Sequence, residues 1–303
     1  MRWISFRWLA AGPIVLAAGC AAPTPPVPVT PADLPSLTYR EVLAAPVTLS
    51  AGTFEGAPYD PGGAARPRVV LLEELTRLGD LNGDGVTDAA ALLVSSTGGS
   101  GEFVHLAAVT GAGGEPENVD TVLLGDRVDL RSVHIDGGNV HLRLLMAGPD
   151  DAACCPMEDV SLAFGLTDGK LVEVAEKHHG RLSAGSLAGT SWQLSHMDLD
   201  DPVTPAATVT LRFLPDGEMT GSAGCNRYSG PYELDTEGWL RVGPLRTTFR
   251  LCRDIVMGLE QRYLRALEAA SHVGFYNARL ALSYHVHEDA GVLLFESAEE
   301  GGE

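Results

Sequence analysis

Basic residues are scarce in this chain. Its 303 residues include 21 lysines and arginines against 40 aspartates and glutamates, so the formal net charge is −19. Such an acidic surface repels phosphate backbones, which argues against nucleic acid as a partner. It also repels anionic lipid head groups, so we expect any attachment to a membrane to come from acyl chains.

The beginning of the chain lacks an apolar run long enough for a stable membrane span. Arg2 and Arg7 precede an apolar stretch from Trp8 to Ala18, which is too short to anchor in a bilayer. A charged start, a short apolar core and small residues before Cys20 are typical of a secretory signal. The run from Leu16 to Cys20 resembles the lipobox of bacterial lipoproteins, with Ala17 where leucine is more usual.

The lipobox resemblance predicts where the protein resides. Residues 1–19 would be removed as a signal peptide, and Cys20 would carry lipid, including acyl chains such as palmitate, on its sulfur and amine. Because a multiply acylated terminus anchors stably, the protein would be held on a membrane. Ala21 is not the aspartate that retains enteric lipoproteins in the inner membrane. We therefore expect the periplasmic face of a bacterial outer membrane.

The remaining chain is long enough for two ordinary domains. Residues 20–36 hold the lipidated cysteine and a proline-rich linker, and residues 298–303 form an acidic tail. Short alternating strands predict a β-rich domain over 37–179, including a hairpin with Gly137-Gly138 at its turn. A second domain is expected over 186–297, where Asp254 to Ala270 forms the one clear helix, capped by Asp254.

Three segments of the second domain carry a family resemblance. Leu187 to Leu194, which includes Trp192, looks like the opening strand of META domains, the group that contains HslJ-like lipoproteins. The sequence Gly224-Cys225-Asn226-Arg227-Tyr228-Ser229-Gly230 is similar to the most distinctive motif of that family. Thr247 to Cys252 is similar to its second cysteine segment, with Phe249 and Leu251 where methionines are frequent.

The resemblance implies a fold more than a reaction. It implies an antiparallel sheet or barrel packed on one helix, in proteins associated with envelope stress, and it implies no catalytic residue. The predicted fold class is therefore mainly β with one clear helix, in two β-rich domains of which the C-terminal one is META-type.

An acidic loop in the first domain is the sharpest chemical motif. Asp80, Asn82, Asp84 and Asp88, with the carbonyl of Val86, have the spacing of a calcium loop, because Ca²⁺ prefers six to eight oxygen ligands. The usual glutamate at the twelfth position is replaced by Ala91. The loop joins two expected strands, so it looks more like the calcium loops of FG-GAP-type repeats than a helix-loop-helix hand. The alternative is an Asx-rich turn closed by its own hydrogen bonds.

Only five cysteines are present, and four remain after Cys20. In an oxidising compartment we expect Cys225 and Cys252 to form a disulfide, the alternative being two buried thiols. Cys154 and Cys155 are adjacent, and they would form a strained ring, bridge elsewhere or serve a redox or metal role.

Histidine pairs are too small for a zinc centre. His134 and His141 face each other across the predicted hairpin, and His285 and His287 share one strand face. Since zinc sites use three or four ligands, these histidines are expected to be surface residues.

The sequence thus predicts a noncatalytic, periplasm-facing lipoprotein with a structural or binding role in the cell envelope. Its expected partners are the membrane, through the lipid, and an envelope protein. Two alternatives remain: an inhibitor of a secreted or periplasmic hydrolase, and an enzyme whose site lies at the domain interface. An enzyme would need a polar pocket with perturbed titratable groups.

Overall fold

The computed structural model describes residues 24–99, 101–149, 151, 156–203, 207–286 and 289–298. Strands make up 52% of the structure and there is one clear helix, which confirms the predicted mainly-β class. In the described ranges, no helix has the length and hydropathy needed to span a membrane. Cys20, Cys154, Cys155 and His287 lie outside these ranges.

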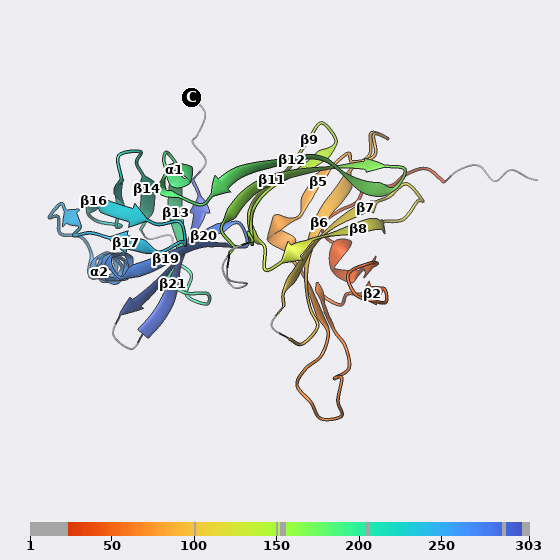
Figure 1. Ribbon diagram of the computed structural model, residues 1–303, viewed down its shortest axis with the longest axis horizontal. Coiled ribbons are helices and arrows are strands. Elements are labelled where there is room, and N and C mark those ends of the chain that lie inside the picture. Colours follow the sequence, from red (N-terminus) through yellow and green to blue (C-terminus); the bar gives the residue numbers. More distant parts are fainter. Residues whose placement is uncertain are drawn as a thin grey trace, which may run out of the picture.

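The N-terminal domain is a two-layer sandwich (Figure 1). One layer has the strand order β3-β4-β6-β7-β8, with β5 beside β6, and the other has the order β12-β11-β10-β9. Alternating apolar residues from both layers form a shared core. The elements are β1 (Thr38–Tyr39), β2 (Val47–Thr48), β3 (Thr53–Glu55), β4 (Arg68–Leu71), β5 (Arg77–Gly79), β6 (Asp88–Ser96), β7 (Phe103–Thr110), β8 (Glu117–Asp126), β9 (Asp129–Asp136), β10 (Asn139–Met146), β11 (Glu158–Thr167) and β12 (Lys170–Arg181), with 3-10 helices at Leu34–Ser36 and Glu73–Leu75.

The proline-rich segment packs against this domain. The sequence predicts only a linker over 20–36. The amides of Val27 and Val29 donate to the carbonyls of Gly111 (3.0 Å) and Thr87 (2.8 Å). Val29 and Leu34 are buried in a second core on the outer face of β6 and β7. That face carries Ala89, Ala91 and other apolar side chains, so it needs a cover that the segment supplies. A Cβ at Gly111 would lie 1.7 Å from the carbonyl oxygen of Val27, so only glycine allows this approach.

The predicted hairpin is present as β9 and β10. Gly137 and Gly138 have φ angles of 56° and 78°, as a two-residue type I′ turn requires. His134 and His141 are directly opposite each other. Their rings stack with centroids 5.0 Å apart.

The C-terminal domain is a nine-stranded antiparallel sheet that nearly closes into a barrel. Its order is β17-β16-β15-β14-β13-β21-β20-β19, with β18 beside β16. A bridge between Trp239 and His272 joins the region of β17 to β19. The elements are α1 (Ala184–Leu187), β13 (Ser191–His196), β14 (Thr210–Phe213), β15 (Glu218–Ser222), β16 (Arg227–Leu234), β17 (Leu240–Val242), β18 (Arg246–Thr247), α2 (Asp254–Glu268), β19 (Ala270–Tyr276), β20 (Arg279–Val286) and β21 (Asp289–Ser297).

Helix α2 contributes its apolar face to the barrel core. Val256, Tyr263 and Leu267 are buried at helical spacing, as the sequence predicts. The predicted cap is wrong by one residue: Arg253 occupies the cap position without a side-chain hydrogen bond, and Asp254 is the first helical residue. There its negative charge faces the positive end of the helix dipole, which is favourable without a capping bond.

The two domains share part of their packing. Leu145 and Met157, from the N-terminal domain, belong to the same apolar core as the barrel residues. β11 and β12 extend from the sandwich toward α1 (Figure 1). The boundary is therefore a packed junction.

Candidate functional site

A disulfide joins the distinctive motif of the C-terminal domain to the segment before α2. Cys225 and Cys252 are bonded, with Cα atoms 6.0 Å apart and 27 residues between them in sequence. This confirms the predicted pairing and excludes the alternative of two buried thiols. The bond holds the segment 246–255, which we call the clamp loop, against the beginning of β16.

Asn226 supplies a second connection to the clamp loop. Its Oδ1 accepts hydrogen bonds from the amide of Arg250 (2.7 Å) and the hydroxyl of Thr248 (2.9 Å). Its Nδ2 donates to the carbonyl of Arg250 (3.2 Å) and to Glu260 Oε1 (2.8 Å). The buried amide thus pairs with the loop as a neighbouring strand would, which holds Thr248 and Arg250 against the start of β16.

Glu260 completes this network from α2. Its Oε2 accepts from the amides of Asn226 (2.6 Å) and Cys225 (3.3 Å). A buried carboxylate is tolerated when hydrogen-bond donors replace its water shell, and here three N–H groups do so. Sequence reasoning missed Glu260, although an acidic residue on the apolar face between Val256 and Tyr263 was a usable signal.

The remaining motif residues shape the support beneath the loop. The Tyr228 hydroxyl lies 2.7 Å from that of Tyr263 and donates to the carbonyl of Thr210 (2.9 Å). Burial raises the pKa of Tyr228, so this pair stays neutral. Gly224 has a φ of 105°, a positive angle that glycine adopts more readily than other residues. A Cβ at Gly230 would lie 2.8 Å from the Leu245 side chain.

Two further motif positions have simple structural roles. The backbone amide of Arg227 donates to the Thr248 hydroxyl (3.2 Å), while its side chain is exposed. The indole of Trp192 is buried and donates to the Thr190 hydroxyl (2.7 Å).

The clamp loop presents large apolar side chains to solvent. Phe249 is 93% exposed, Leu251 is 84% exposed, and Ile255 at the start of α2 is 66% exposed. All ten residues from 246 to 255 are exposed. Apolar surface held in this way is typical of an interaction site, because folding alone would favour its burial.

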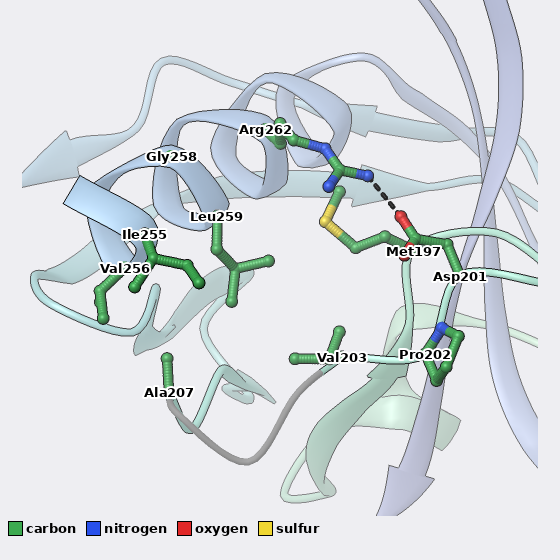
Figure 2. A pocket seen from close by; sticks show the side chains of 10 residues that line it. All are labelled: Met197, Asp201, Pro202, Val203, Ala207, Ile255, Val256, Gly258, Leu259 and Arg262. Carbon is green, nitrogen blue, oxygen red and sulfur yellow. Dashed lines mark hydrogen bonds and ion pairs between the residues drawn. The ribbon is translucent and has the colours of Figure 1, made fainter. Parts of the chain in front are cut away.

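Ile255 also lines a groove beside α2 (Figure 2). The groove has a volume of about 360 Å³ and lies between α2 and the segment that follows β13. An ion pair between Arg262 and Asp201, with Nη2 and Oδ2 2.5 Å apart, connects the two sides. The lining is mainly apolar and consists of Met197, Asp201, Pro202, Val203, Ala207, Ile255, Val256, Gly258, Leu259 and Arg262.

The acidic loop of the N-terminal domain is closed by its own hydrogen bonds. Asp80 accepts from the amides of Gly83 (2.7 Å) and Gly85 (2.9 Å). Asn82 and Asp84 each accept from the amide two residues later, at 2.9 and 2.8 Å. These are the bonds of the Asx-turn alternative. Across the part of the chain that the structure describes, no three His, Cys, Asp or Glu residues are grouped to hold a metal. Calcium binding stays a prediction.

Asp88 lies beneath this loop and is only 1% exposed. Its Oδ2 accepts from the amides of Leu81 (3.0 Å) and Asn82 (3.3 Å). Its Oδ1 is buried and has no partner among the described residues. Burial raises the pKa of Asp88, against the opposing effect of the two amides.

A half-buried carboxylate lies where the domains meet. Asp129 on β9 accepts a hydrogen bond from the amide of Phe275 on β19 (3.1 Å). Burial raises its pKa to about 6. The guanidinium of Arg131 lies 4.6 Å from the centroid of the Phe275 ring. Asp129 also lines an interdomain pocket of about 300 Å³ with Glu102 and Arg127.

These contacts define a class of protein domain: an antiparallel β-barrel with one packed helix, whose signature loop is fastened by a disulfide. Residues 185–300 match the family model described as META domain, so the C-terminal part of this chain is a META domain. That finding confirms the resemblance drawn from the motif.

Comparison with solved structures gives two similar chains. An NMR structure of a protein from Burkholderia xenovorans is 26% identical, with a TM-score of 0.31, over 39% of this chain and 87% of its own. A second NMR structure is 21% identical, with a TM-score of 0.33, over 40% of this chain and 99% of its own. No curated protein matches the chain.

Proposed function

We propose that this chain is a noncatalytic lipoprotein of the bacterial cell envelope that binds a partner through the clamp loop of its META domain. The observation that carries the proposal is the exposure of Phe249 and Leu251 on a loop fastened by the Cys225–Cys252 bond. A preorganised loop loses little conformational freedom on binding, so more of its contact energy becomes affinity. The leader and Cys20 support placement on the periplasmic face of the outer membrane.

Site-specific photo-crosslinking in cells tests the binding surface. A photoreactive amino acid at position 249 is expected to form adducts with an envelope component, because that side chain is almost fully exposed. The matched control is position 174, where an exposed valine lies on β12 of the other domain. An absence of adducts at 249, or equal adducts at both positions, would contradict the proposal.

The predicted address is tested separately. Mass spectrometry of the mature N-terminus is expected to find an acylated Cys20, and Cys20→Ala is expected to abolish that acylation. In an enteric host, Ala21→Asp is expected to shift the protein to the inner membrane, and Ala22→Asp is the control. An intact initiator methionine would contradict this address.

A rigid exposed loop also suits an inhibitor of a secreted or periplasmic hydrolase. In that case affinity capture from envelope extracts would retain one dominant hydrolase, and the Phe249→Ser variant would no longer capture it. Several unrelated captured proteins, or inhibition that survives the substitution, would count against this alternative.

A further inference from the structure

The clamp loop differs in charge from the rest of the molecule. The chain as a whole has a net charge of −19, yet the loop contains Arg246, Arg250 and Arg253 and only one acid, Asp254. Arg227 is exposed on the adjoining strand β16. None of these four arginines takes part in the ion pairs found among the described residues. Exposed cationic residues therefore flank the apolar side chains along the loop.

The apolar and cationic side chains alternate along the loop. Phe249, Leu251 and Ile255 are separated by Arg250 and Arg253, and all five are exposed. A surface of this composition suits the boundary between lipid head groups and acyl chains, where the apolar side chains leave water while guanidinium groups pair with phosphates. Anionic lipids add an attraction for each arginine near the surface.

We propose that the clamp loop docks on an anionic phospholipid surface through Phe249, Leu251 and Ile255, with Arg246, Arg250 and Arg253 pairing with lipid phosphates. This inference rests on the proposed function of the loop as a binding surface and names its partner. A second copy of the chain is a poorer fit. A symmetric contact through this loop would place the arginines of one copy against those of the other, and like charges repel.

The arrangement of the molecule makes this a second attachment point. Helix α2 lies near one end of the long axis, and the described chain begins near the opposite end (Figure 1). Acyl chains on Cys20 would hold the end where the described chain begins, and the clamp loop would hold the end near α2. Two linked attachments bind more tightly than either alone, because the second becomes intramolecular.

Vesicle co-sedimentation without the lipid anchor tests the docking. The protein used would begin at residue 20 and carry Cys20→Ser. This form retains every described residue. It is expected to bind vesicles of phosphatidylethanolamine and phosphatidylglycerol, to bind phosphatidylcholine vesicles at least fivefold more weakly, and to lose binding as salt increases.

Two double variants separate the apolar and charged contributions. Phe249→Ser with Leu251→Ser, and Arg250→Glu with Arg253→Glu, are each expected to reduce partition at least fivefold. The control is Val172→Ser with Val174→Ser, which removes an equally spaced exposed apolar pair on β12. Unchanged near-UV circular dichroism would show that each variant is folded. A Phe249→Trp fluorescence maximum is expected to shift to shorter wavelength on anionic vesicles, whereas that of Val174→Trp is not.

Several outcomes would overturn the docking. They are no binding to anionic vesicles, binding that both loop variants leave unchanged, and a dimer in sedimentation analysis that Phe249→Ser with Leu251→Ser abolishes. If vesicle binding fails while position 249 still crosslinks to an envelope protein, the lipid is the wrong partner but the proposed function stands. If both experiments fail, the proposed function fails as well.

Discussion

Two loops in different domains are each fastened by a buried carboxylate. Glu260 lies under the clamp loop and receives three N–H donors on its two oxygens. Asp88 lies under the acidic loop and receives two donors on Oδ2, while Oδ1 has no partner among the described residues. Asp129 at the domain junction receives one donor, from Phe275.

The comparison shows how solvation by the protein decides the cost of a buried charge. Each N–H donor replaces part of the water that the carboxylate loses, so a carboxylate with few donors is more easily protonated. Burial accordingly raises the pKa of Asp88 and raises that of Asp129 to about 6. Only the clamp loop adds a covalent bond, which suits a surface that must hold apolar side chains in water.

The largest effect is expected from removing the covalent bond. Cys225→Ser with Cys252→Ser opens a loop of 27 residues and should lower the free energy of unfolding by ~3–4 kcal/mol by the loop-entropy relation. Denaturant unfolding of the variant and the parent measures this. A reductant should destabilise the parent more than the variant. Equal stability of the two proteins would mean that the hydrogen bonds alone hold the loop.

The next effect comes from Glu260→Gln. The amide replaces one acceptor oxygen with a donor that faces other donors, so we expect the free energy of unfolding to fall by about 1–3 kcal/mol. Glu268→Gln is the matched control, because Glu268 is exposed on the same helix. If both substitutions had the same effect, the network around Asn226 would contribute little to stability.

Asp129→Asn tests how much the ionised Asp129 side chain, which receives a single hydrogen bond, destabilises the folded protein. The folded-state pKa, about 6, is above the ordinary value of 3.8, so the ionised carboxylate destabilises the folded state. Wild-type stability should therefore be full below pH 4 and decrease as the pH rises through 6. Asparagine still accepts from Phe275 but does not ionise, so the variant should gain about 2–3 kcal/mol at pH 8 and little at pH 4. Parallel pH profiles for variant and wild type would refute this.

The smallest effect is expected from calcium at the acidic loop. With a millimolar dissociation constant, a few millimolar Ca²⁺ would stabilise the protein by about 1 kcal/mol and raise the melting temperature by a few degrees. Thermal melts with calcium and with chelator measure the shift. Asp84→Asn should remove it, and Asp216→Asn, in a turn of the other domain, should not. An unchanged melting temperature in wild type would show that the loop does not bind calcium usefully and serves only as an Asx turn.

The sequence predicted the parts of the fold that depend on local pattern. Alternation and the Gly137-Gly138 pair were enough for the hairpin, and helical spacing was enough for α2. The family motif predicted the META domain, and the expected oxidising compartment predicted the disulfide. The segment near Val29 was misjudged, because its prolines indicate an extended chain but do not show which surface it covers.

The sequence by itself determined the strand content, the single amphipathic helix and the excess of negative charge, because each depends on residue type and spacing. It predicted the bond between Cys225 and Cys252 only together with the expected oxidising compartment. Only the tertiary structure decided that Glu260 supports Asn226, that Asp129 reaches Phe275, and that Phe249 and Leu251 lie exposed among arginines. The physical reason is that exposure and solvation depend on which distant segments pack together, and no local pattern specifies that packing.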